Sequence, residues 1–368
     1  MYDDILCFVR VNFPDDPNVC DMLYWYVCPF DGAAPGDHVI APLGRHNNTQ
    51  EGVICEVRIT EEYNAPFPLY LIKSIRKLIK KMRRSVDFMY KIAKKRVLNP
   101  TVTMMDIEAP LVAKKGKAGQ FIILRVDKDG ERIPLTIAGC DVENGTVKII
   151  FQVVGATTMA LNQKNEGDYI EDFVGPLGCP TKTDGVKKVC IVGGGVGCAI
   201  ALPVAQEFHK LGAEVHSIVG FRNKDLVILE DEFKACSDKL TIMTDDGSYG
   251  RHGVVTLPLK EALESGEKYD EVIAIGPVIM MKFVVATTRP FNVPTTVSMN
   301  PIMIDGTGMC GGCRLTVGGK TKFACVDGPD FNGFEVDFDE AMERSTMYSD
   351  FERHEREETC NLFRQEVK

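Results

Sequence analysis

The sequence predicts a multidomain β and α/β protein in which two all-β modules precede a doubly wound, parallel-sheet α/β domain and a C-terminal loop module. Three observations support this fold class. Short apolar runs separated by Gly- and Pro-containing turns fill residues 1–72, which is typical of a small β-barrel. A buried strand, a glycine turn and a helix follow one another in KKVCIVGGGVGCAIALPVAQEFHKLG, the pattern of an α/β unit. Three cysteines then lie close together in a glycine-rich segment between residues 310 and 325.

Composition sets outer bounds on the class of protein. The chain has 368 residues, which is enough for two or three domains with full cores. No apolar run approaches the roughly 18 residues of a membrane span, and the first residues lack a signal-peptide pattern. The thirteen cysteines are odd in number and scattered, which fits a reducing compartment. We therefore expect a cytoplasmic protein with no membrane span.

Charge is distributed unevenly along the chain. Residues 1–96 carry 14 Lys and Arg against 12 Asp and Glu, a net charge of +2, whereas residues 97–368 carry 29 against 40, a net charge of −11. The front of the chain and its body therefore differ in electrostatic character.

Residues 1–72 are predicted to form the small barrel. The stretch YWYVCPFDGAAPGDHVIAPLGRHNNTQEGVI resembles the N-terminal DNA-binding domain of the primosomal replication-restart helicase PriA, at Tyr26, Val27, Pro35, Gly36, Val39, Pro42, Gly44, Arg45, Gly52 and Val53. The resemblance implies nucleic-acid binding. The same Pro-Gly and Gly-Arg turns would serve any small barrel, and we favour that simpler interpretation.

Residues 73–96 are predicted to form a basic linker helix. The segment carries eleven basic residues and one acid, and its apolar residues recur at intervals of three and four. A basic amphipathic helix can bind nucleic acid or a membrane surface. We favour a linker helix that packs its apolar stripe on a neighbour and leaves its basic face in solvent.

Residues 97–180 alternate strands and turns and are predicted to form a second β-barrel. Within it, Arg132 and Thr136 of GERIPLT can contact the phosphate and ring of a flavin. Gly155, Thr157 and Thr158 of VGATT can supply donors to a pyrophosphate. A surface hairpin would give a similar pattern.

Residues 181–290 are predicted to form the α/β domain. The turn after its first strand contains Gly193, Gly194, Gly195 and Gly197, and such a turn lets the backbone approach a pyrophosphate at a helix N-terminus. The alternative is a tight turn with no ligand. Arg222 and Lys224 follow the second strand, where they can meet a ribose or a 2′-phosphate or remain solvated turn charges. Gly276 and Pro277 end a later strand, at a position suited to completing the pocket.

Residues 291–334 contain DGTGMCGGC and FACVDGP and are predicted to hold a [2Fe–2S] cluster. Asp305, Cys310, Cys313 and Cys325 are spaced like the C-x4-C-x2-C…C ligands of plant-type centres, with a carboxylate in the first position. A zinc ribbon is the alternative, but zinc prefers two paired motifs, and only one CxxC occurs here. Residues 335–368 are predicted to be a charged helical tail.

Residues 91–348 resemble the iron–sulfur flavoprotein branch of the ferredoxin-reductase superfamily. The motifs are GERIPLT, GPLGCP, TDDGSYG, IGPVIMM, NPIMIDGTGMCGGCRLTVGG and KFACVDGPDFNGFEVDFDEAM. This branch includes electron-transfer subunits of dihydroorotate dehydrogenase B, sulfide dehydrogenase and NADH-dependent reduced ferredoxin:NADP oxidoreductase. The resemblance places the flavin-contact motif at Arg132, Pro134, Leu135 and Thr136, the dinucleotide turn at 193–197 and the cluster ligands at Asp305, Cys310, Cys313 and Cys325. Asp305 favours the ferredoxin:NADP branch, because the dihydroorotate branch has cysteine at this first ligand position.

The resemblance implies an NAD(P)H-dependent iron–sulfur flavoprotein oxidoreductase. It would pass electrons between NAD(P)H, FAD and a [2Fe–2S] cluster and on to a larger, glutamate-synthase-small-chain-like iron–sulfur flavoprotein subunit. Ferredoxin is a further partner if the complex bifurcates electrons. Hydride transfer needs no protein acid or base, so we name no catalytic residue. Two alternatives remain: a subunit serving dihydroorotate or sulfide dehydrogenase, and a redox-sensing nucleic-acid-binding protein. Arg222 and Lys224 permit NADP, whereas the resemblance favours NAD.

Overall fold

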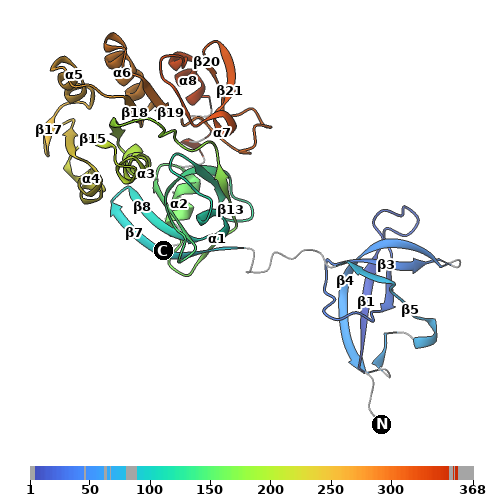
Figure 1. Ribbon diagram of the computed structural model, residues 1–368. Helices are drawn as coiled ribbons and strands as arrows, with labels where there is room; N and C mark the ends of the chain where they lie inside the picture. The colour runs from blue at the N-terminus through green and yellow to red at the C-terminus, as the bar shows by residue number, and fades with distance from the viewer. Residues whose placement is uncertain are drawn as a thin grey trace. The chain divides into compact units, whose positions relative to one another are not determined.

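Three large β-sheets and one small one organise the part of the chain described by the computed structural model, namely residues 5–44, 47–61, 64–66, 68–79, 89–347, 351 and 353–354. The chain divides into two units, Met1–Val86 and Asp87–Lys368 (Figure 1). Each unit has its own apolar core. No helix within the described ranges has the length and apolar character needed to cross a membrane.

The first unit is a barrel-like sheet of six strands in the order β5-β2-β1-β4-β3-β6. Its strands are β1 Ile5–Asn12, β2 Leu23–Val27, β3 His38–Leu43, β4 Asn48–Glu61, β5 Lys73–Ser74 and β6 Lys77–Ile79. Alternate residues of β1 point into the core, because Val9, Val11 and the following Phe13 are almost fully buried. Tyr26 is also buried in this core, and its hydroxyl donates a hydrogen bond to the Pro42 carbonyl at 3.1 Å.

The predicted basic helix over 73–96 is wrong wherever the structure describes it. Residues 73–74 and 77–79 are strands β5 and β6, and β7 Tyr90–Asn99 begins the second unit. The apolar residues of the supposed stripe serve two separate cores: Ile75 belongs to the first unit and Ile92 to the second. One helix could not bury both. The middle of the segment, 80–88, lies outside the described residues.

The second unit begins with a seven-stranded barrel-like sheet in the order β12-β7-β8-β11-β10-β9-β13. Its further elements are β8 Val102–Glu108, α1 Pro110–Ala113, β9 Phe121–Arg125, β10 Arg132–Asp141, β11 Thr146–Gln152, α2 Ala156–Gln163, β12 Tyr169–Ile170 and β13 Asp172–Leu177. The predicted second barrel is present, but it starts at Tyr90 rather than at residue 97. Strand β9 is buried on both faces, with Ile122, Ile123 and Leu124 fully inaccessible.

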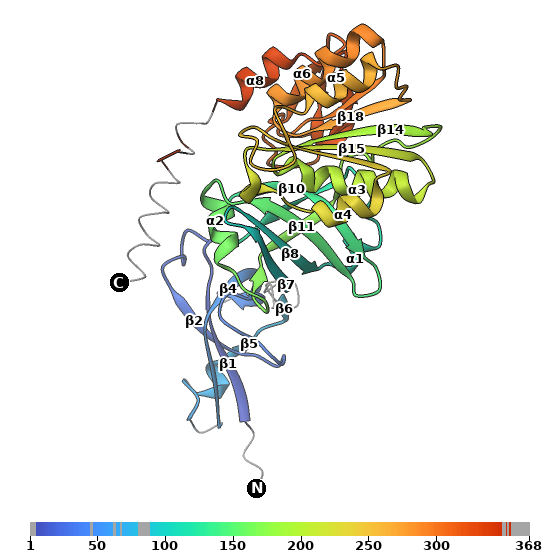
Figure 2. The same ribbon diagram turned by 90° about the vertical axis from the view of Figure 1, so that its left-hand side faces the viewer.

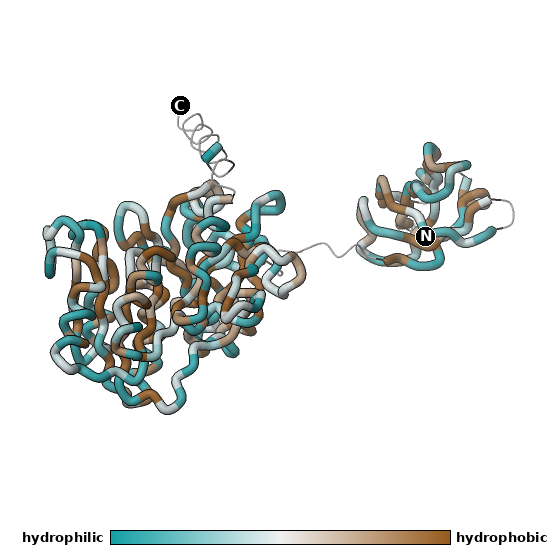
Figure 3. Tube along the Cα trace, turned by 90° about the horizontal axis from the view of Figure 1, so that it is seen from above, coloured by the Kyte–Doolittle hydropathy of each residue, from teal (hydrophilic) through white to brown (hydrophobic). Residues whose placement is uncertain are grey.

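The α/β domain is doubly wound, as the sequence predicts. Its strands β14 Lys188–Gly194, β15 Glu214–Phe221, β16 Lys239–Thr244, β17 Arg251–His252, β18 Glu271–Ile275 and β19 Thr295–Ser298 are parallel. Helices α3 Gly197–Lys210 and α4 Glu230–Cys236 cover one face of the sheet, and α5 Thr256–Glu264 and α6 Val278–Thr288 cover the other (Figure 2). Apolar residues concentrate along the inner strands, and hydrophilic residues mark the periphery (Figure 3).

The cysteine-containing segment is joined to this sheet. A hairpin of β20 Arg314–Val317 and β21 Lys320–Phe323 leads into α7 Ala324–Asp327 and then β22 Asp330–Asn332, which pairs antiparallel with β19. The sheet order is therefore β17-β16-β15-β14-β18-β19-β22. The predicted domain end at residue 290 is too early, because the sheet continues to residue 332.

Within the predicted helical tail, 335–368, the structure describes one helix, α8 Phe338–Ser345. Its N-cap is Asp337, whose carboxylate accepts from the backbone N–H groups of Asp339 and Glu340. The helix is tied to the second unit by a Lys282–Asp339 ion pair at 2.6 Å and by the Arg344 guanidinium, which donates to the Gly312 carbonyl at 3.1 Å. Beyond residue 347 only three residues are described.

Candidate functional site

A cavity of about 740 Å³ opens at the carboxyl ends of the parallel strands. In a doubly wound sheet this is where ligands bind. The sequence-predicted residues that line it are Gly194, Gly195, Gly197, Arg222, Gly276 and Pro277. Gly193, the residue before Gly194 on β14, is buried against α3. The structure therefore gathers the predicted dinucleotide residues around one cavity.

Two glycines of this turn are required by geometry. A Cβ on Gly197 would lie 2.6 Å from the Ile275 carbonyl oxygen and 2.7 Å from the Gly276 Cα, so only glycine lets α3 approach β18 this closely. Gly195 has a φ of +56°, in the left-handed region that favours glycine. The start of α3 therefore faces the cavity, where helix N–H groups favour a phosphate.

Several lining residues were missed by sequence reasoning. Asn99, Thr101 and Gln152 reach the cavity from the barrel, and Ser298 and Asn300 from the end of β19. The buried Asn99 amide donates to the Leu226 carbonyl at 3.3 Å, across 127 residues of sequence. No local sequence pattern indicates such a contact.

Arg222 is exposed at the cavity and forms no ion pair with any described residue. Lys224 Nζ instead lies 5.9 Å from the centre of the Tyr249 ring, in cation–π geometry. The two basic residues that the sequence placed together therefore differ in their surroundings, and Arg222 is the one available to a ligand.

The predicted flavin residues occupy β10 and the start of α2. Arg132, Pro134, Leu135 and Thr136 lie on β10, where Pro134 pairs with Ile123 of β9. Arg132 Nε is buried and has no hydrogen-bond partner among the described residues. A buried guanidinium nitrogen without an acceptor is costly, so this position suits an anionic group such as a cofactor phosphate.

The VGATT turn has a structural role of its own. The Thr158 hydroxyl accepts from the backbone N–H groups of Val154 and Gly155, both at 3.0 Å, and donates to the Gly155 carbonyl at 2.9 Å. Thr157 donates to Glu131 at 3.3 Å, which fastens α2 to the β9–β10 turn. The Thr158 hydroxyl is therefore engaged in capping, and the free N–H groups of the first helical turn are the donors left for a pyrophosphate.

Asp305 organises the turn that precedes the cysteines. Its Oδ2 accepts from the Thr307 hydroxyl, from the Thr307 N–H at 3.1 Å and from the Met309 N–H at 3.3 Å. These hydrogen bonds, the Thr307 hydroxyl first, lower the pKa of Asp305. No described residue donates to Oδ1. The carboxylate is thus ionised and keeps one oxygen open.

The three cysteines differ in exposure. Cys310 is exposed, and the backbone N–H of Gly312 lowers its pKa. Cys313 and Cys325 are buried, and their thiols contact each other; burial raises the pKa of Cys325 to about 12. A raised pKa favours the protonated thiol. Bound iron would reverse this preference, because a thiol that coordinates a metal loses its proton.

The four predicted ligands lie near one another, and Cys310 is within electrostatic range of both Asp305 and Cys325. Cys313 contacts Cys325, while Asp305 lies within electrostatic range of Cys310, where its charge partly opposes the lowering of the Cys310 pKa. No three or more His, Cys, Asp or Glu side chains in the described ranges lie close enough to hold one metal ion. A dinuclear centre needs only two protein ligands on each iron, so this arrangement fits a [2Fe–2S] cluster.

The cysteine loop lies directly on the flavin-type barrel. A Cβ on Gly306 would lie 2.7 Å from Leu177 Cδ1 of β13 and 2.8 Å from Ile123 Cδ1 of β9. The charge of Arg132 also lowers the pKa of Asp305. The candidate flavin strand and the candidate cluster loop are therefore neighbours, which an electron path requires.

These features define the chain as a ferredoxin-reductase-type protein with a C-terminal iron–sulfur domain. Residues 300–337 match the model of the iron–sulfur cluster binding domain of dihydroorotate dehydrogenase B. A solved structure reported for flavin-based electron bifurcation by NADH-dependent reduced ferredoxin-NADP oxidoreductase superposes with a TM-score of 0.70. That chain is 45% identical, and the match covers 75% of this chain and 98% of that one.

Two relatives extend the comparison. A Thermotoga maritima protein described as a dihydroorotate dehydrogenase B (NAD(+)) electron transfer subunit homolog is 48% identical over 67% of this chain and 87% of its own length. An uncharacterized Clostridium beijerinckii protein encoded in the adh 3′ region is 52% identical over 71% of this chain and 90% of its own length. The chain belongs to the family of dihydroorotate dehydrogenase B electron-transfer subunits and their homologues. The resemblance drawn from the sequence motifs is confirmed.

Proposed function

We propose that this chain is the electron-input subunit of a larger oxidoreductase, with NAD(P)H, FAD and a [2Fe–2S] cluster as its cofactors. When bound, the flavin supplies the step between two-electron hydride chemistry and one-electron transfer. The contact of the cysteine loop with Ile123 and Leu177 is the observation that carries this proposal, because the proposed cluster ligands belong to the loop that packs on the flavin-type barrel.

The residues have distinct roles in this proposal. The turn 193–197 and the start of α3 would hold the dinucleotide pyrophosphate, while Gly276 and Pro277 bound the cavity on the side of α6. Arg132 would meet a flavin phosphate, and the first turn of α2 would supply further N–H donors. Asp305 and Cys310 would bind one iron, and Cys313 and Cys325 the other. No side chain is assigned a catalytic proton transfer.

For the partner, we propose a larger, glutamate-synthase-small-chain-like iron–sulfur flavoprotein subunit, in ferredoxin-linked electron bifurcation. The similar solved structure named above supports this choice, since its description concerns such bifurcation. The names of the relatives support the alternative, a dihydroorotate dehydrogenase complex that uses NAD. We propose NADH as the electron donor and Arg222 as the candidate contact for the ribose of the dinucleotide. A cytoplasmic location is supported by the described cysteines, none of which forms a disulfide.

The test is a cofactor assay on the full chain purified without oxygen. We expect bound flavin, two irons and two sulfides per chain, and bleaching of both chromophores by NADH faster than by NADPH. A Cys313→Ala variant should keep its flavin and lose its iron, and Cys55→Ala, at an exposed cysteine of the first unit, is the control. A wild-type chain that binds no flavin would contradict the proposal.

A further inference from the structure

The linker 178–181, between barrel and α/β domain, is hydrogen-bonded to two other parts of the second unit. The Gln120 side chain donates to the Gly178 carbonyl at 2.8 Å, and the Thr181 N–H donates to the Ala118 carbonyl at 3.0 Å. The Cys179 N–H donates to the Gly328 carbonyl at 2.6 Å. The linker is thereby bonded to the barrel on one side and to the cluster module on the other.

Asp330 lies where this linker, the cluster module and the dinucleotide sheet meet. It follows α7, which carries Cys325, and it opens β22 opposite Ser298 of β19. Ser298 lines the dinucleotide cavity. The Thr181 hydroxyl donates to Asp330 Oδ2 at 2.6 Å. Asp330 therefore links the cluster module to the linker through its side chain and to the dinucleotide sheet through its backbone.

The surroundings of Asp330 favour a neutral carboxyl group. Oδ1 is buried, and no described residue lies in hydrogen-bonding geometry to it. None of the ion pairs among described residues involves Asp330. Ionising a buried carboxyl without a cation is costly. Burial accordingly raises the pKa of Asp330, and the hydroxyl groups of Thr181 and Ser298 oppose this shift only partly.

We propose that Asp330 is a positioning residue, whose carboxyl group holds the cluster-bearing segment 324–329 against the linker 178–181 by accepting from the Thr181 hydroxyl. The inference rests on the proposed function, since it concerns a segment that would carry the ligand Cys325. Asp330 is not itself a proposed ligand. Its role would be to fix the position of the cluster relative to the flavin barrel.

The experiment compares Asp330→Asn, Asp330→Ala and Thr181→Val in the full chain. An amide carbonyl can still accept from Thr181 and carries no charge, so Asp330→Asn should match the wild type. Asp330→Ala and Thr181→Val each remove the bond, and amide hydrogen exchange in 178–181 and 324–330 should accelerate about tenfold, as expected for about 1.4 kcal/mol. The electron paramagnetic resonance spectrum of the dithionite-reduced cluster should broaden in both. Thr321→Val, an exposed threonine of the same module, should change neither readout.

Three outcomes would overturn the inference. Asp330→Asn behaving like Asp330→Ala would mean that a negative charge, not a neutral group, is needed. Unchanged exchange and spectrum in Asp330→Ala would mean that the contact positions nothing. A double variant, Asp330→Ala with Thr181→Val, that is clearly worse than either single change would mean that the two residues act separately. Hydrogen exchange is also measured on the iron-free chain, where it tests the Thr181–Asp330 contact by itself. A wild-type chain that loads no cluster would refute the proposed function, and the exchange data would still test this inference.

Discussion

Gly306 packs against Leu177 with no room for a side chain: an added Cβ would lie 2.7 Å from Leu177 Cδ1. Gly306 also has a φ of +83°, in the left-handed region. Steric space and backbone conformation therefore both require glycine at the point where the cysteine loop meets the barrel.

Gly306→Ala should displace the loop and lower iron occupancy. Overpacking costs about 1–3 kcal/mol, and the left-handed conformation adds about 1–2 kcal/mol. Gly319→Ala, in the β20–β21 hairpin, is the matched control, because its φ is +70° but nothing lies within 4 Å of the added Cβ. Iron content and the urea midpoint of both variants test this. Equal losses in the two would show that the Leu177 contact is unimportant.

Gly197→Ala should separate α3 from β18 and impair dinucleotide binding. The added Cβ meets the Ile275 carbonyl oxygen and the Gly276 backbone, which cannot move as a flexible side chain would. We expect a loss of about 1–3 kcal/mol in stability and a raised KM for NADH. Gly212→Ala, just beyond α3, carries only the strain of its φ of +82° and should leave KM unchanged. A normal KM in Gly197→Ala would contradict this interpretation of the turn.

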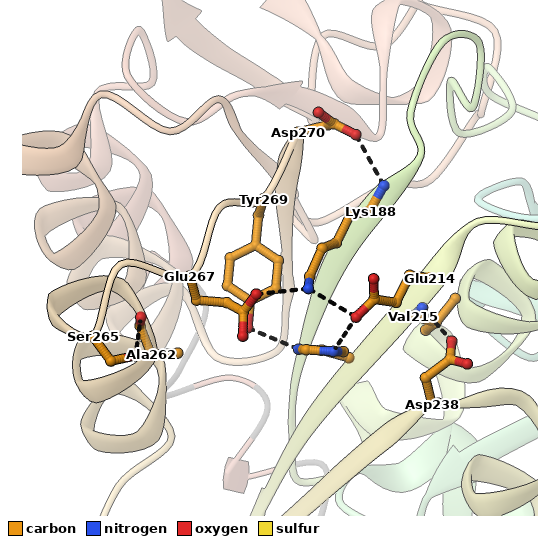
Figure 4. A network of polar contacts seen from close by, with 10 residues as sticks. Lys188, Glu214, Val215, Asp238, Ala262, Ser265, Glu267, Tyr269 and Asp270 are labelled. Atoms are coloured by element: carbon orange, nitrogen blue, oxygen red, sulfur yellow. Dashed lines mark hydrogen bonds and ion pairs between the residues drawn. The ribbon is translucent and has the colours of Figure 1, made fainter.

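Lys188, at the amino end of β14, lies between the carboxylates of Glu214, at the amino end of β15, and Glu267, which precedes β18 (Figure 4). Its Nζ lies 2.8 Å from Glu214 and 2.6 Å from Glu267. The hydrogen bonds from Lys188 lower the pKa of both glutamates below 4.5. Their stabilising effect is therefore complete above pH 4.5 and is lost as the pH falls through the lowered values.

Lys188→Met should accordingly be less stable than the wild type at neutral pH, and the difference should shrink as the pH falls below 4.5. Urea midpoints across this range measure it. Lys210→Met is the control, since Lys210 is 77% exposed and lies 3.9 Å from Glu207. A constant difference at all pH values would exclude the two glutamates as its source.

Asp305 offers a test of the ligand set. Asp305→Cys should keep the cluster with a changed absorption spectrum and reduction potential, because thiolate replaces a carboxylate on one iron. Asp305→Ala should lose most of its iron, and it also removes the acceptor of the Thr307 and Met309 N–H groups. Potentiometry and iron analysis distinguish these outcomes. An Asp305→Ala protein with the wild-type cluster spectrum would show that the carboxylate only shapes the loop.

A variant that begins at residue 89 should retain the cofactors and NADH reactivity of the second unit. The first unit has its own core around Val9, Val11 and Phe13, and no residue of that core belongs to those of the second unit. Cofactor content and the NADH reduction rate check this. Loss of flavin in the shortened chain would reveal a dependence between the units. Nucleic-acid binding by the first unit stays a prediction, tested by salt-dependent binding of the full chain.

The sequence predicted best where local chemistry decides the structure. The glycine turn at 193–197 and the cysteine spacing are short motifs whose roles follow from backbone conformation and ligand geometry. The helix predicted over 73–96 failed because spacing says which residues are apolar, not which core receives them. Ile75 and Ile92 are buried in different units, and pairing of β6 with β3 and of β7 with β8 decided the conformation.

The missed parts of the site depend on contacts between distant segments. Asn99, at the end of barrel strand β7, lines the cavity, and its side-chain amide donates a hydrogen bond to the Leu226 carbonyl. The Thr181–Asp330 bond spans 149 residues. Neither pair has a periodic or compositional signature, so only the tertiary structure brings them together.

Strand β22 makes the cluster module inseparable from the dinucleotide domain. The module supplies the outermost strand of the sheet, pairing residues 330–332 with 296–298. A chain shortened to end before the cysteine loop would leave β19 as a bare edge, with unpaired N–H and C=O groups that invite association with other chains. The iron-binding segment of this protein is therefore not an independent domain, as an appended ferredoxin would be. Any segment that replaced it would also have to supply an edge strand that pairs with β19.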